Sequence, residues 1–348
     1  MEQKTAYSVG VLGAGTWGAA LARMLSLTGK AVTVWSALPQ ELEVLRTTRR
    51  HPKLPHMELP ETIAYTADLG TACRGKDILL FAVPSPYVRT TARAVRPFIT
   101  AGQILVDAAK GIEPDTLLTL TEVMQEELGT DTVACVALSG PTHAEEVALG
   151  LPTTIVAAHP DDAIAAQVQR CFTSPFMRVY TSRDRRGVEI AGALKNIIAL
   201  GTGISAGLGF GDNARAALIT RGLAELSRLG ERIGCRPQTF GGLAGVGDLI
   251  VTCTSEHSRN NRCGRLIGQG VPPDEAVRQV GMVVEGINAL PAAMALADRA
   301  GVELPIVFTV NAIINGHVSP AGAVQKLLQR ELKAELPPET LEGGAETL

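Results

Sequence analysis

The 348-residue sequence lacks the residue spacings that mark disulfide-stabilised and metal-binding proteins. Its six cysteines are scattered and form no CxxC pair, and its six histidines form no pair at the spacing of metal ligands on a helix. Dispersed cysteines of this kind are typical of reduced thiols in a cytosolic protein. We therefore expect no disulfide framework and no metal site.

An excess of charge of one sign is also missing, as are long apolar runs. The formal net charge is −3, which favours neither a nucleic-acid partner nor a membrane surface. No uninterrupted apolar run reaches the roughly 18 residues of a membrane span, and the first residues do not resemble a signal peptide. With 46% hydrophobic and 19% charged residues, the sequence predicts a soluble, cytoplasmic protein long enough for two domains.

A glycine-rich motif, GAGTWG at 13–18, lies between a predicted strand at 8–12 and a predicted helix at 16–27. A G-x-G-x-x-G motif in this context is typical of dinucleotide binding. Its glycines permit a tight turn, close approach of a pyrophosphate and close helix–strand packing, while the helix N-terminus favours phosphate. The predicted cofactor-binding residues are Gly13, Gly15, Thr16, Trp17 and Gly18.

The end of the second predicted strand, 31–35, does not reveal which dinucleotide binds. An acidic residue here is common in NAD enzymes, whereas an arginine nearby accommodates the 2′-phosphate of NADP. The chain instead continues Ser36-Ala37, and Glu41 lies too far along to assign from sequence. Arg46, Arg49 and Arg50 would have to fold back to reach a 2′-phosphate. The choice between NAD and NADP stays open.

Alternating strands and helices continue to about residue 183 and predict a Rossmann-like, mostly parallel sheet. The further expected strands are 77–83, 103–107, 132–138, 153–157 and 177–181, with a helix at 161–172. Lys110 comes just after the strand at 103–107, at the edge where open α/β sheets bind ligands. Taken alone, it is equally consistent with an ordinary loop lysine.

The remaining periodicity is helical, which predicts an all-α second domain at 184–335 after a dinucleotide-binding domain at 1–183. The expected helices are 187–209, 213–234, 248–254, 260–268, 273–280, 285–301, 305–315 and 320–332. The Pro-, Gly- and Glu-rich tail at 336–348 is expected to be flexible.

One helix, 187–209, is apolar or small on nearly every side, which is typical of a buried helix. Lys195 and Asn196 interrupt it midway. An unpaired ammonium group is costly to bury, so Lys195 requires a partner, a cavity or a ligand. The small residues one helical turn away leave room for such a group to approach Lys195. We interpret Lys195 as a catalytic lysine rather than as a solvated surface residue.

The segment 241–264 gathers polar side chains within a short stretch. Asp248 falls at a predicted helix start, where it would act as an N-cap or as a functional carboxylate. Hydroxyl, amide and guanidinium groups follow at Thr252 and in the sequence SRNNR, 258–262. Arginine binds phosphate in a bidentate manner, so this set suits a phosphorylated substrate, although such a cluster is often simply solvated.

Five motifs occur in order over residues 8–330: GAGTWG, AAKGIE, LSGPTHAEEVALGLPT, GALKNIIALGTGISAGLGFGDNARAALITRGLAE and GLAGVGDLIVTCTSEHSRNNRCG. Together they resemble the bacterial NAD(P)-dependent glycerol-3-phosphate dehydrogenases. The resemblance implies NAD or NADP as cofactor, a small phosphorylated substrate and no metal. The sequence departs from the family at Ser36-Ala37, where many members carry a basic residue, so strict NADP preference is in doubt.

The resemblance also assigns roles to individual residues. Lys195, with Asp248 and Lys110, forms the catalytic set, and Lys110 contacts both substrate and cofactor. The further substrate contacts implied or inferred are Gly140, Thr142, Asn196, Thr252, Ser258, Arg259 and Asn260. The further cofactor contacts implied are Ala144, Arg259, Val283 and Glu285.

These assignments describe reversible reduction of dihydroxyacetone phosphate to sn-glycerol 3-phosphate, with Lys195 as general acid and base. By resemblance the product supplies glycerophospholipid synthesis, and a homodimer through the helical domain is possible. The alternatives are a β-hydroxyacid dehydrogenase or ketopantoate reductase, which would not require the SRNNR cluster, and a non-catalytic nicotinamide sensor. Oligomeric state, physiological direction and feedback regulation are not readable from the sequence.

Overall fold

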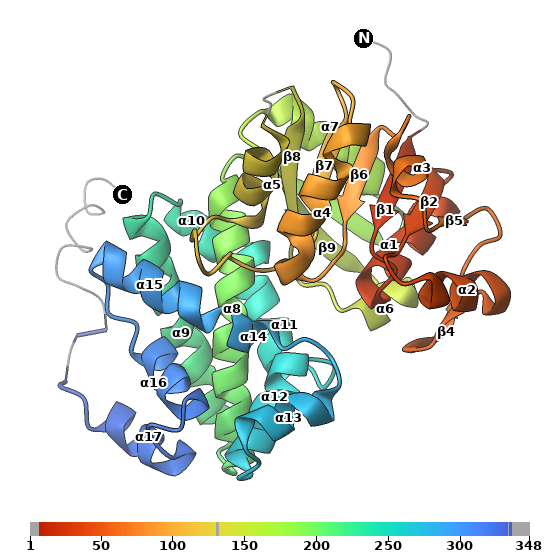
Figure 1. The fold of residues 1–348 in the computed structure, drawn as a ribbon. Coiled ribbons are helices and arrows are strands. Elements are labelled where there is room, and N and C mark those ends of the chain that lie inside the picture. Colours follow the sequence, from red (N-terminus) through yellow and green to blue (C-terminus); the bar gives the residue numbers. More distant parts are fainter. Residues whose placement is uncertain (1–6, 130–131, 333, 336–348) are drawn as a thin grey trace, which may run out of the picture.

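The computed structural model describes residues 7–129, 132–332 and 334–335. The expected flexible tail at 336–348 lies outside these residues. Figure 1 shows an α/β part, in red to yellow, beside an all-helical part, in green to blue. The helical part begins at residue 185, so the predicted fold class is confirmed.

The α/β part is built on an eight-stranded sheet in the order β10-β9-β8-β7-β6-β1-β2-β5. Every neighbouring pair is parallel except β8 and β9. The strands are β1 Ser8–Leu12, β2 Ala31–Trp35, β5 Ala64–Thr66, β6 Ile78–Phe81, β7 Ile104–Asp107, β8 Ala134–Ser139, β9 Thr153–Ala158 and β10 Met177–Ser182. The seven predicted strands are confirmed. The three-residue β5 and the hairpin of β3 Arg50–His51 and β4 Leu54–Glu58 escaped prediction because they are short and partly exposed.

Helices cover both faces of this sheet, which explains the continuous apolar character of its central strands. Three of them pack with α2 (Pro39–Thr48) into one hydrophobic core: α1 (Thr16–Leu27), α6 (Ala144–Ala148) and α7 (Asp162–Phe172). On the opposite face a second core contains α3 (Leu69–Cys73), α4 (Val88–Val95) and α5 (Leu120–Leu128). The carboxyl ends of the parallel strands are left free for ligand-binding loops.

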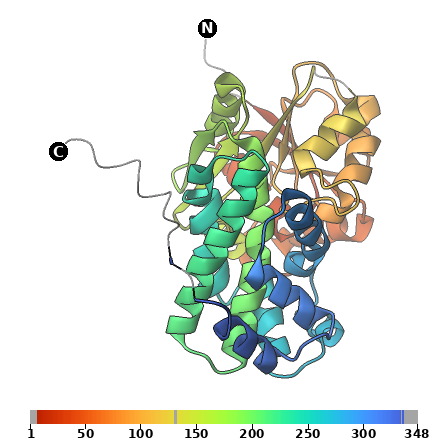
Figure 2. The ribbon, with the colours of Figure 1, turned by 90° about the vertical axis from the view of Figure 1, so that its left-hand side faces the viewer.

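The helical part surrounds one long central helix, α8 Arg185–Gly207, which is buried along almost its whole length. Among the described residues it is the one helix long and apolar enough to cross a membrane. Its apolar 18-residue window is 89% buried inside the protein, which identifies it as a core helix. Figure 2 shows α8 and α9 running side by side as green ribbons. The other helices are α9 Asp212–Arg232, α10 Pro237–Phe240, α11 Asp248–Thr254, α12 Arg259–Gly268, α13 Pro273–Val280, α14 Glu285–Asn288, α15 Leu290–Ala300, α16 Pro305–Ile314 and α17 Pro320–Leu328.

One local expectation for the helical part was wrong. The single helix expected at 285–301 is divided into α14 and α15 at Ala289, because Pro291 has no amide hydrogen to continue the first helix. Just before Asp248, the residues Leu243–Gly247 form a π-helical segment that leads directly into α11. Such π-helical segments are frequent beside functional sites.

Helices α8 and α12 cross with their backbones in direct contact, because glycines lie on both sides of the crossing. A Cβ atom on Gly203 would overlap the Asn261 carbonyl oxygen, and one on Gly264 would overlap the Leu200 carbonyl oxygen. Gly207 and Gly268 repeat the arrangement one turn further along. The glycines therefore set the distance between the helix that carries Lys195 and the helix that carries Arg259.

We expect Gly264→Ala to lower the free energy of unfolding by roughly 1–3 kcal/mol, because the added methyl group overpacks a backbone-to-backbone contact. Urea unfolding followed by circular dichroism measures this difference. Gly241→Ala is the matched control, since a Cβ there meets nothing closer than the Gln238 oxygen at 3.6 Å. Equal stability of the two variants would contradict the close-packing account.

Candidate active site

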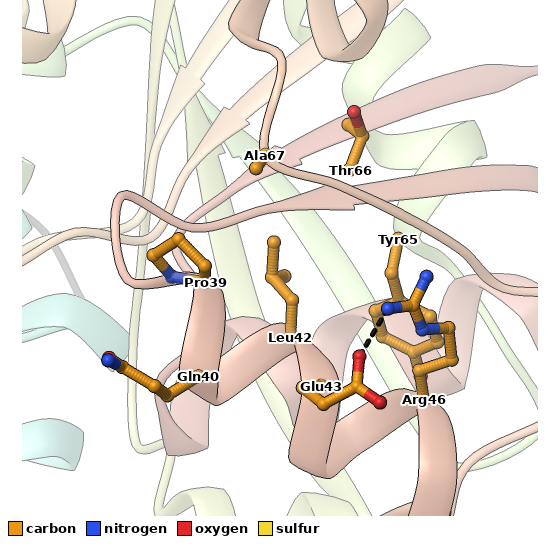
Figure 3. A pocket seen from close by; sticks show the side chains of 8 residues that line it. All are labelled: Pro39, Gln40, Leu42, Glu43, Arg46, Tyr65, Thr66 and Ala67. Atoms are coloured by element: carbon orange, nitrogen blue, oxygen red, sulfur yellow. Dashed lines mark hydrogen bonds and ion pairs between the residues drawn. The ribbon is translucent and has the colours of Figure 1, made fainter.

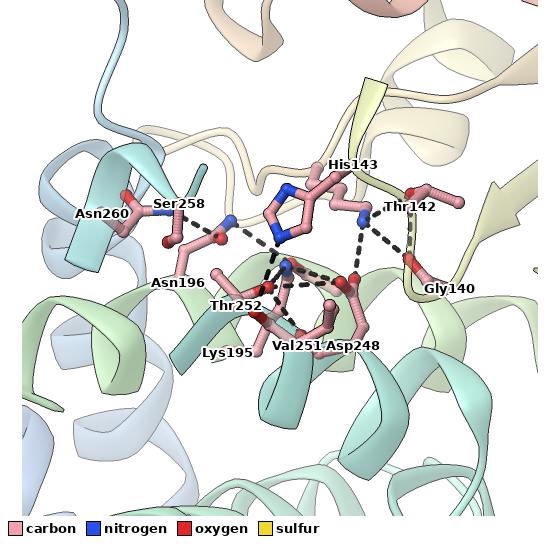
Figure 4. Close-up of polar contacts among 12 residues, drawn as sticks. Gly140, Thr142, His143, Lys195, Asn196, Asp248, Val251, Thr252, Ser258 and Asn260 are labelled. Carbon is pink, nitrogen blue, oxygen red and sulfur yellow. Dashed lines mark hydrogen bonds and ion pairs between the residues drawn. The ribbon is translucent and has the colours of Figure 1, made fainter. Parts of the chain in front are cut away.

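Lys195 lies in the middle of α8 and is only 4% exposed. Its Nζ donates to Oδ1 of Asp248 at 2.7 Å and also contacts Oγ1 of Thr252 (Figure 4). The hydroxyl of Thr252 donates in turn to the backbone oxygen of Asp248 at 2.6 Å. The ammonium group therefore has the partners that its burial requires.

Asp248, which is 1% exposed, connects two lysines that come from the two halves of the chain. Its Oδ1 accepts from Lys195, and its Oδ2 accepts from Nζ of Lys110 at 2.6 Å. The N-cap of α11 is Gly247, and Asp248 is already the first residue of the helix. The capping role considered for Asp248 is therefore wrong, and its carboxylate is a bridge between two ammonium groups.

Lys110 reaches this bridge from the loop after β7. Its Nζ also donates to the backbone oxygen of Gly140 at 3.0 Å and to Oγ1 of Thr142 at 3.3 Å. Gly140 has a φ of +149°, and a Cβ there would lie 3.0 Å from Cα of Ile155, so the turn after β8 requires glycine. The loops after β7 and β8 are joined through one lysine at the carboxyl edge of the sheet.

The environment of Lys195 favours a neutral amine more than water does. The pKa of Lys195 is lowered to about 8, chiefly by burial; the charge of Asp248 opposes this shift, and the nearby positive charge of Lys110 adds to it. The cluster contains two ammonium groups and one carboxylate. A lysine with a pKa near neutrality can both give and take a proton under physiological conditions.

A chain of amides continues from Lys195 towards α12 and α14. Nδ2 of Asn260 donates to Oδ1 of Asn196 at 2.9 Å, and Oδ1 of Asn260 accepts from the amide of Gly286 at 2.8 Å. A Cβ on Gly286 would lie 2.5 Å from the backbone oxygen of Asn196, so the close approach depends on glycine. These contacts hold the start of α12 beside the part of α8 that carries Lys195 and Asn196.

Arg259 differs from its neighbours at the start of α12. Ser258 caps the helix by accepting from the amide of Asn261 at 3.2 Å, and Asn260 is engaged as described above. Half-buried Arg259 makes no hydrogen bond or ion pair to any residue that the structure describes. The helix start therefore presents an unpaired guanidinium group together with free amide hydrogens, an arrangement suited to an anion.

The glycine-rich loop has the shape that a dinucleotide requires. Gly13 has a φ of +119°, and a Cβ there would lie 2.7 Å from the Ala82 oxygen. A Cβ on Gly18 would overlap the Gly13 oxygen, whereas one on Gly15 would meet nothing within 4 Å. Gly15 is the N-cap of α1 without a side-chain cap, and the first turn, with Thr16 and Trp17, holds no acidic residue. The amides at this helix start are free for a pyrophosphate.

The remaining predicted cofactor residues lie on neighbouring segments. The carboxylate of Glu285, at the start of α14, accepts from Oγ of Ser85 at 2.7 Å, in the loop after β6. This bond brings Glu285 to the carboxyl edge of the sheet. Val283 is half-buried two residues before it, and buried Ala144 begins α6 directly after the loop that holds Thr142. The structure shows no polar side-chain contact that defines the roles of Val283 and Ala144.

Three residues at the site were missed by sequence reasoning. The ring of His143 lies beside the lysine cluster, and burial lowers the pKa of this histidine (Figure 4). The hydroxyl of Ser139 is buried without a partner among the described residues and faces Gly192 of α8. Ser85 holds Glu285. Ser139 and His143 lie in the same sequence motif as Gly140 and Thr142, and this position in the motif is the sequence signal that could have identified them.

Two family models match the chain. The model described as NAD-dependent glycerol-3-phosphate dehydrogenase N-terminus covers residues 8–165, and its C-terminus counterpart covers residues 184–325. The chain belongs to this family. The family resemblance read from the motifs is thereby confirmed, and with it the class of NAD(P)-dependent oxidoreductases.

Similar proteins match this chain over most of its length. A glycerol-3-phosphate dehydrogenase [NAD(P)+] 2 of Lactobacillus delbrueckii subsp. bulgaricus is 59% identical over 94% of this chain and 98% of that protein. A glycerol-3-phosphate dehydrogenase [NAD(P)+] of Agathobacter rectalis is 47% identical over 94% of this chain and 97% of that protein. The crystal structure of glycerol-3-phosphate dehydrogenase from Coxiella burnetii has a TM-score of 0.89 and 37% identity, covering 94% of this chain and 100% of that one.

A ketopantoate reductase of the PanE/ApbA family from Ralstonia eutropha also shares the fold, with a TM-score of 0.61 and 18% identity over 88% of this chain and 97% of that one. This likeness shows the architecture alone. The family models and the full-length relatives therefore favour the glycerol-3-phosphate dehydrogenases over this alternative.

Proposed function

We propose that the protein reversibly reduces dihydroxyacetone phosphate to sn-glycerol 3-phosphate with NADH or NADPH. The observation that carries this proposal is the buried Lys195–Asp248–Lys110 cluster beside the unpaired Arg259. It combines a proton donor with an anion-binding group. The names of the full-length relatives support the same reaction.

Lys195 is the general acid of the proposed reduction. A reduced nicotinamide, when bound, supplies the hydride that adds to the carbonyl carbon of the substrate. The proton on Nζ of Lys195 goes to the carbonyl oxygen, which becomes the hydroxyl of glycerol 3-phosphate. In the reverse direction, neutral Lys195 removes the hydroxyl proton. A pKa of about 8 lets one residue serve both directions near neutral pH.

The surrounding residues orient this lysine and hold the substrate oxygens. Asp248 fixes Nζ of Lys195 and balances the charge of Lys110, and Lys110 and Asn196 hold the substrate oxygens. We assign Thr252 to Lys195 instead of to the substrate phosphate, because its hydroxyl already contacts Nζ and the Asp248 backbone. The half-buried ring of His143 lies beside this cluster.

The phosphate of the substrate binds at the start of α12 in this proposal. Arg259 supplies the guanidinium group, and Ser258 and Asn260 shape the helix start that provides amide hydrogens. Gly140 and Thr142 border the substrate through Lys110. The dinucleotide is held by the loop 13–18, with Ala144, Val283, Glu285, Lys110 and Arg259 contributing further contacts.

We further propose that residues 1–183 act as the dinucleotide domain and residues 184–335 as the substrate domain. Their boundary lies just before α8, which supplies Lys195. A homodimer through the helical domain, a cytoplasmic location and supply of glycerophospholipid synthesis are proposed on the family resemblance. Size-exclusion chromatography with light scattering tests the dimer.

The phosphate requirement tests the reaction directly. With dihydroxyacetone phosphate the protein should oxidise NADH or NADPH, followed by absorbance, and with unphosphorylated dihydroxyacetone the rate should be at least about 100-fold lower. Arg259→Met should lower kcat/KM for the phosphorylated ketone by about 10- to 100-fold, because it removes a charged hydrogen-bonding group. Arg262→Met, an exposed position on the same helix, is the control. Equal turnover of both ketones would overturn the substrate assignment.

Replacement of the proposed acid should separate chemistry from cofactor binding. Lys195→Ala is expected to lower kcat by about 10²- to 10⁴-fold, because the substitution removes the proposed proton donor. NADH binding, measured by calorimetry, should stay within about threefold of wild type because the loop 13–18 is unchanged. Loss of both functions together would indicate a structural role for Lys195.

The pH dependence of kcat/KM should follow the protonation state of Lys195. Oxidation of glycerol 3-phosphate requires neutral Lys195, so kcat/KM should rise with pH and level off above about 8. Reduction requires the ammonium form and should decline over the same range. Asp248→Asn removes the charge that favours the ammonium form of Lys195, so the midpoint of the pH profile of this variant should move to lower pH. An unchanged or higher midpoint in this variant would contradict the assignment.

A further inference from the structure

We infer that the adenosine end of the cofactor site selects NADH over NADPH, and that Glu41, held by Ser36, is the selecting residue. This inference deepens the proposed function and rests on it. The sequence left the choice open because neither Ser36 nor Ala37 is acidic or basic. The structure supplies the missing acidic group from the first turn of α2.

Ser36 occupies the position where a Rossmann domain meets the adenosine ribose. It follows β2 directly, and the amide of Gly13 in the glycine-rich loop donates to the oxygen of Trp35 at 2.8 Å. The side chain of Ser36 is buried, and its Oγ donates to Oε2 of Glu41 at 2.7 Å. The amide of Leu38 donates to the same Oγ at 3.1 Å, which fixes the turn.

Glu41 therefore places an acidic group at the end of β2, although it lies five residues after Ser36 in the sequence. Its exposed side chain is accessible to a ligand. A carboxylate at this position accepts a hydrogen bond from the ribose 2′-hydroxyl of NADH. The 2′-phosphate of NADPH would instead place like charges side by side, which is unfavourable.

The three arginines on and just after α2 have other partners. Arg46 pairs with Glu43 on its own helix. Arg49 donates to the Leu59 oxygen at 2.9 and 2.7 Å and pairs with Glu61, while Arg50 donates to the Pro55 oxygen at 3.2 Å. Burial lowers the pKa of His51, so this histidine adds little positive charge near Glu41 at neutral pH.

The space next to this position also lacks a free cation. A hollow of about 380 Å³ lies between α2 and the end of β5, joined to β2 by the bond from Nε1 of Trp35 to the Ala67 oxygen at 3.1 Å. Figure 3 shows that Arg46, the one cation in its lining, points to Glu43. The lining residues are Pro39, Gln40, Leu42, Glu43, Arg46, Tyr65, Thr66 and Ala67. Their net charge is zero, which does not suit a 2′-phosphate.

Calorimetric titration of the full-length protein with NADH and with NADPH tests this inference. Wild type should bind NADH at least about tenfold more tightly, the ratio expected for one charged contact. Glu41→Gln keeps the hydrogen bond to Ser36 but removes the charge, and should reduce the NADH-to-NADPH affinity ratio by about fivefold or more. Adding Ala37→Arg to this variant should move the ratio further towards NADPH.

Glu58→Gln is the matched control, because it removes the same charge from an exposed position in the same part of the fold. Its affinity ratio should equal that of wild type. Equal binding of the two dinucleotides by wild type, tighter binding of NADPH, or equal shifts in the Glu41 and Glu58 variants would overturn the inference. Binding needs no turnover, so NADH selectivity without ketone reduction would reject the proposed reaction and leave the selectivity in place.

Discussion

The contact on which the site depends is the carboxylate of Asp248 between the ammonium groups of Lys195 and Lys110. Charges buried to this extent are tolerated only when each has a close partner of opposite sign. Because Lys110 follows a strand of the α/β part whereas Lys195 and Asp248 lie on helices of the second part, the pairing also joins the two halves. The same ion pairs that satisfy the buried charge of Lys195 therefore also join the two halves.

The bridge can form only because the helices around Lys195 pack unusually closely. Glycines at the crossing of α8 and α12 let the two backbones touch, and Gly286 does the same between α14 and α8. The Asn196–Asn260 bond, between residues 64 apart in sequence, follows from this packing. Asn260, the residue after Arg259, is thus held against Asn196, the residue after Lys195, by close contacts at glycines. Small residues in the long apolar helix are part of the site, although none of them contributes a functional group.

Sequence patterns predicted the features that depend on local chemistry. Apolar runs located the central strands, and the GAGTWG motif located the loop between β1 and α1. The isolation of Lys195 in an apolar helix predicted that its ammonium group needs a buried partner, which the structure shows to be Asp248. The bridging of Asp248, the antiparallel β9 and the ring of His143 depend on packing between distant segments, which periodicity does not describe. Glu41 was set aside because of its distance along the chain, yet a turn at Leu38 returns it to Ser36.

Glu41 and Glu285 are held in similar ways at the carboxyl edge of the sheet. Each carboxylate accepts a hydrogen bond from a serine in the segment after a parallel strand. Ser36 directly follows β2 and bonds Glu41, and Ser85 lies in the loop after β6 and bonds Glu285. In both cases the acid comes from a helix start, where the helix dipole stabilises it. Serine hydroxyls at the strand ends thus position acids that the strands themselves lack. A search for cofactor-selecting residues that reads only the strand end would miss this arrangement, because the selecting group is defined by its hydrogen bond and not by its place in the sequence.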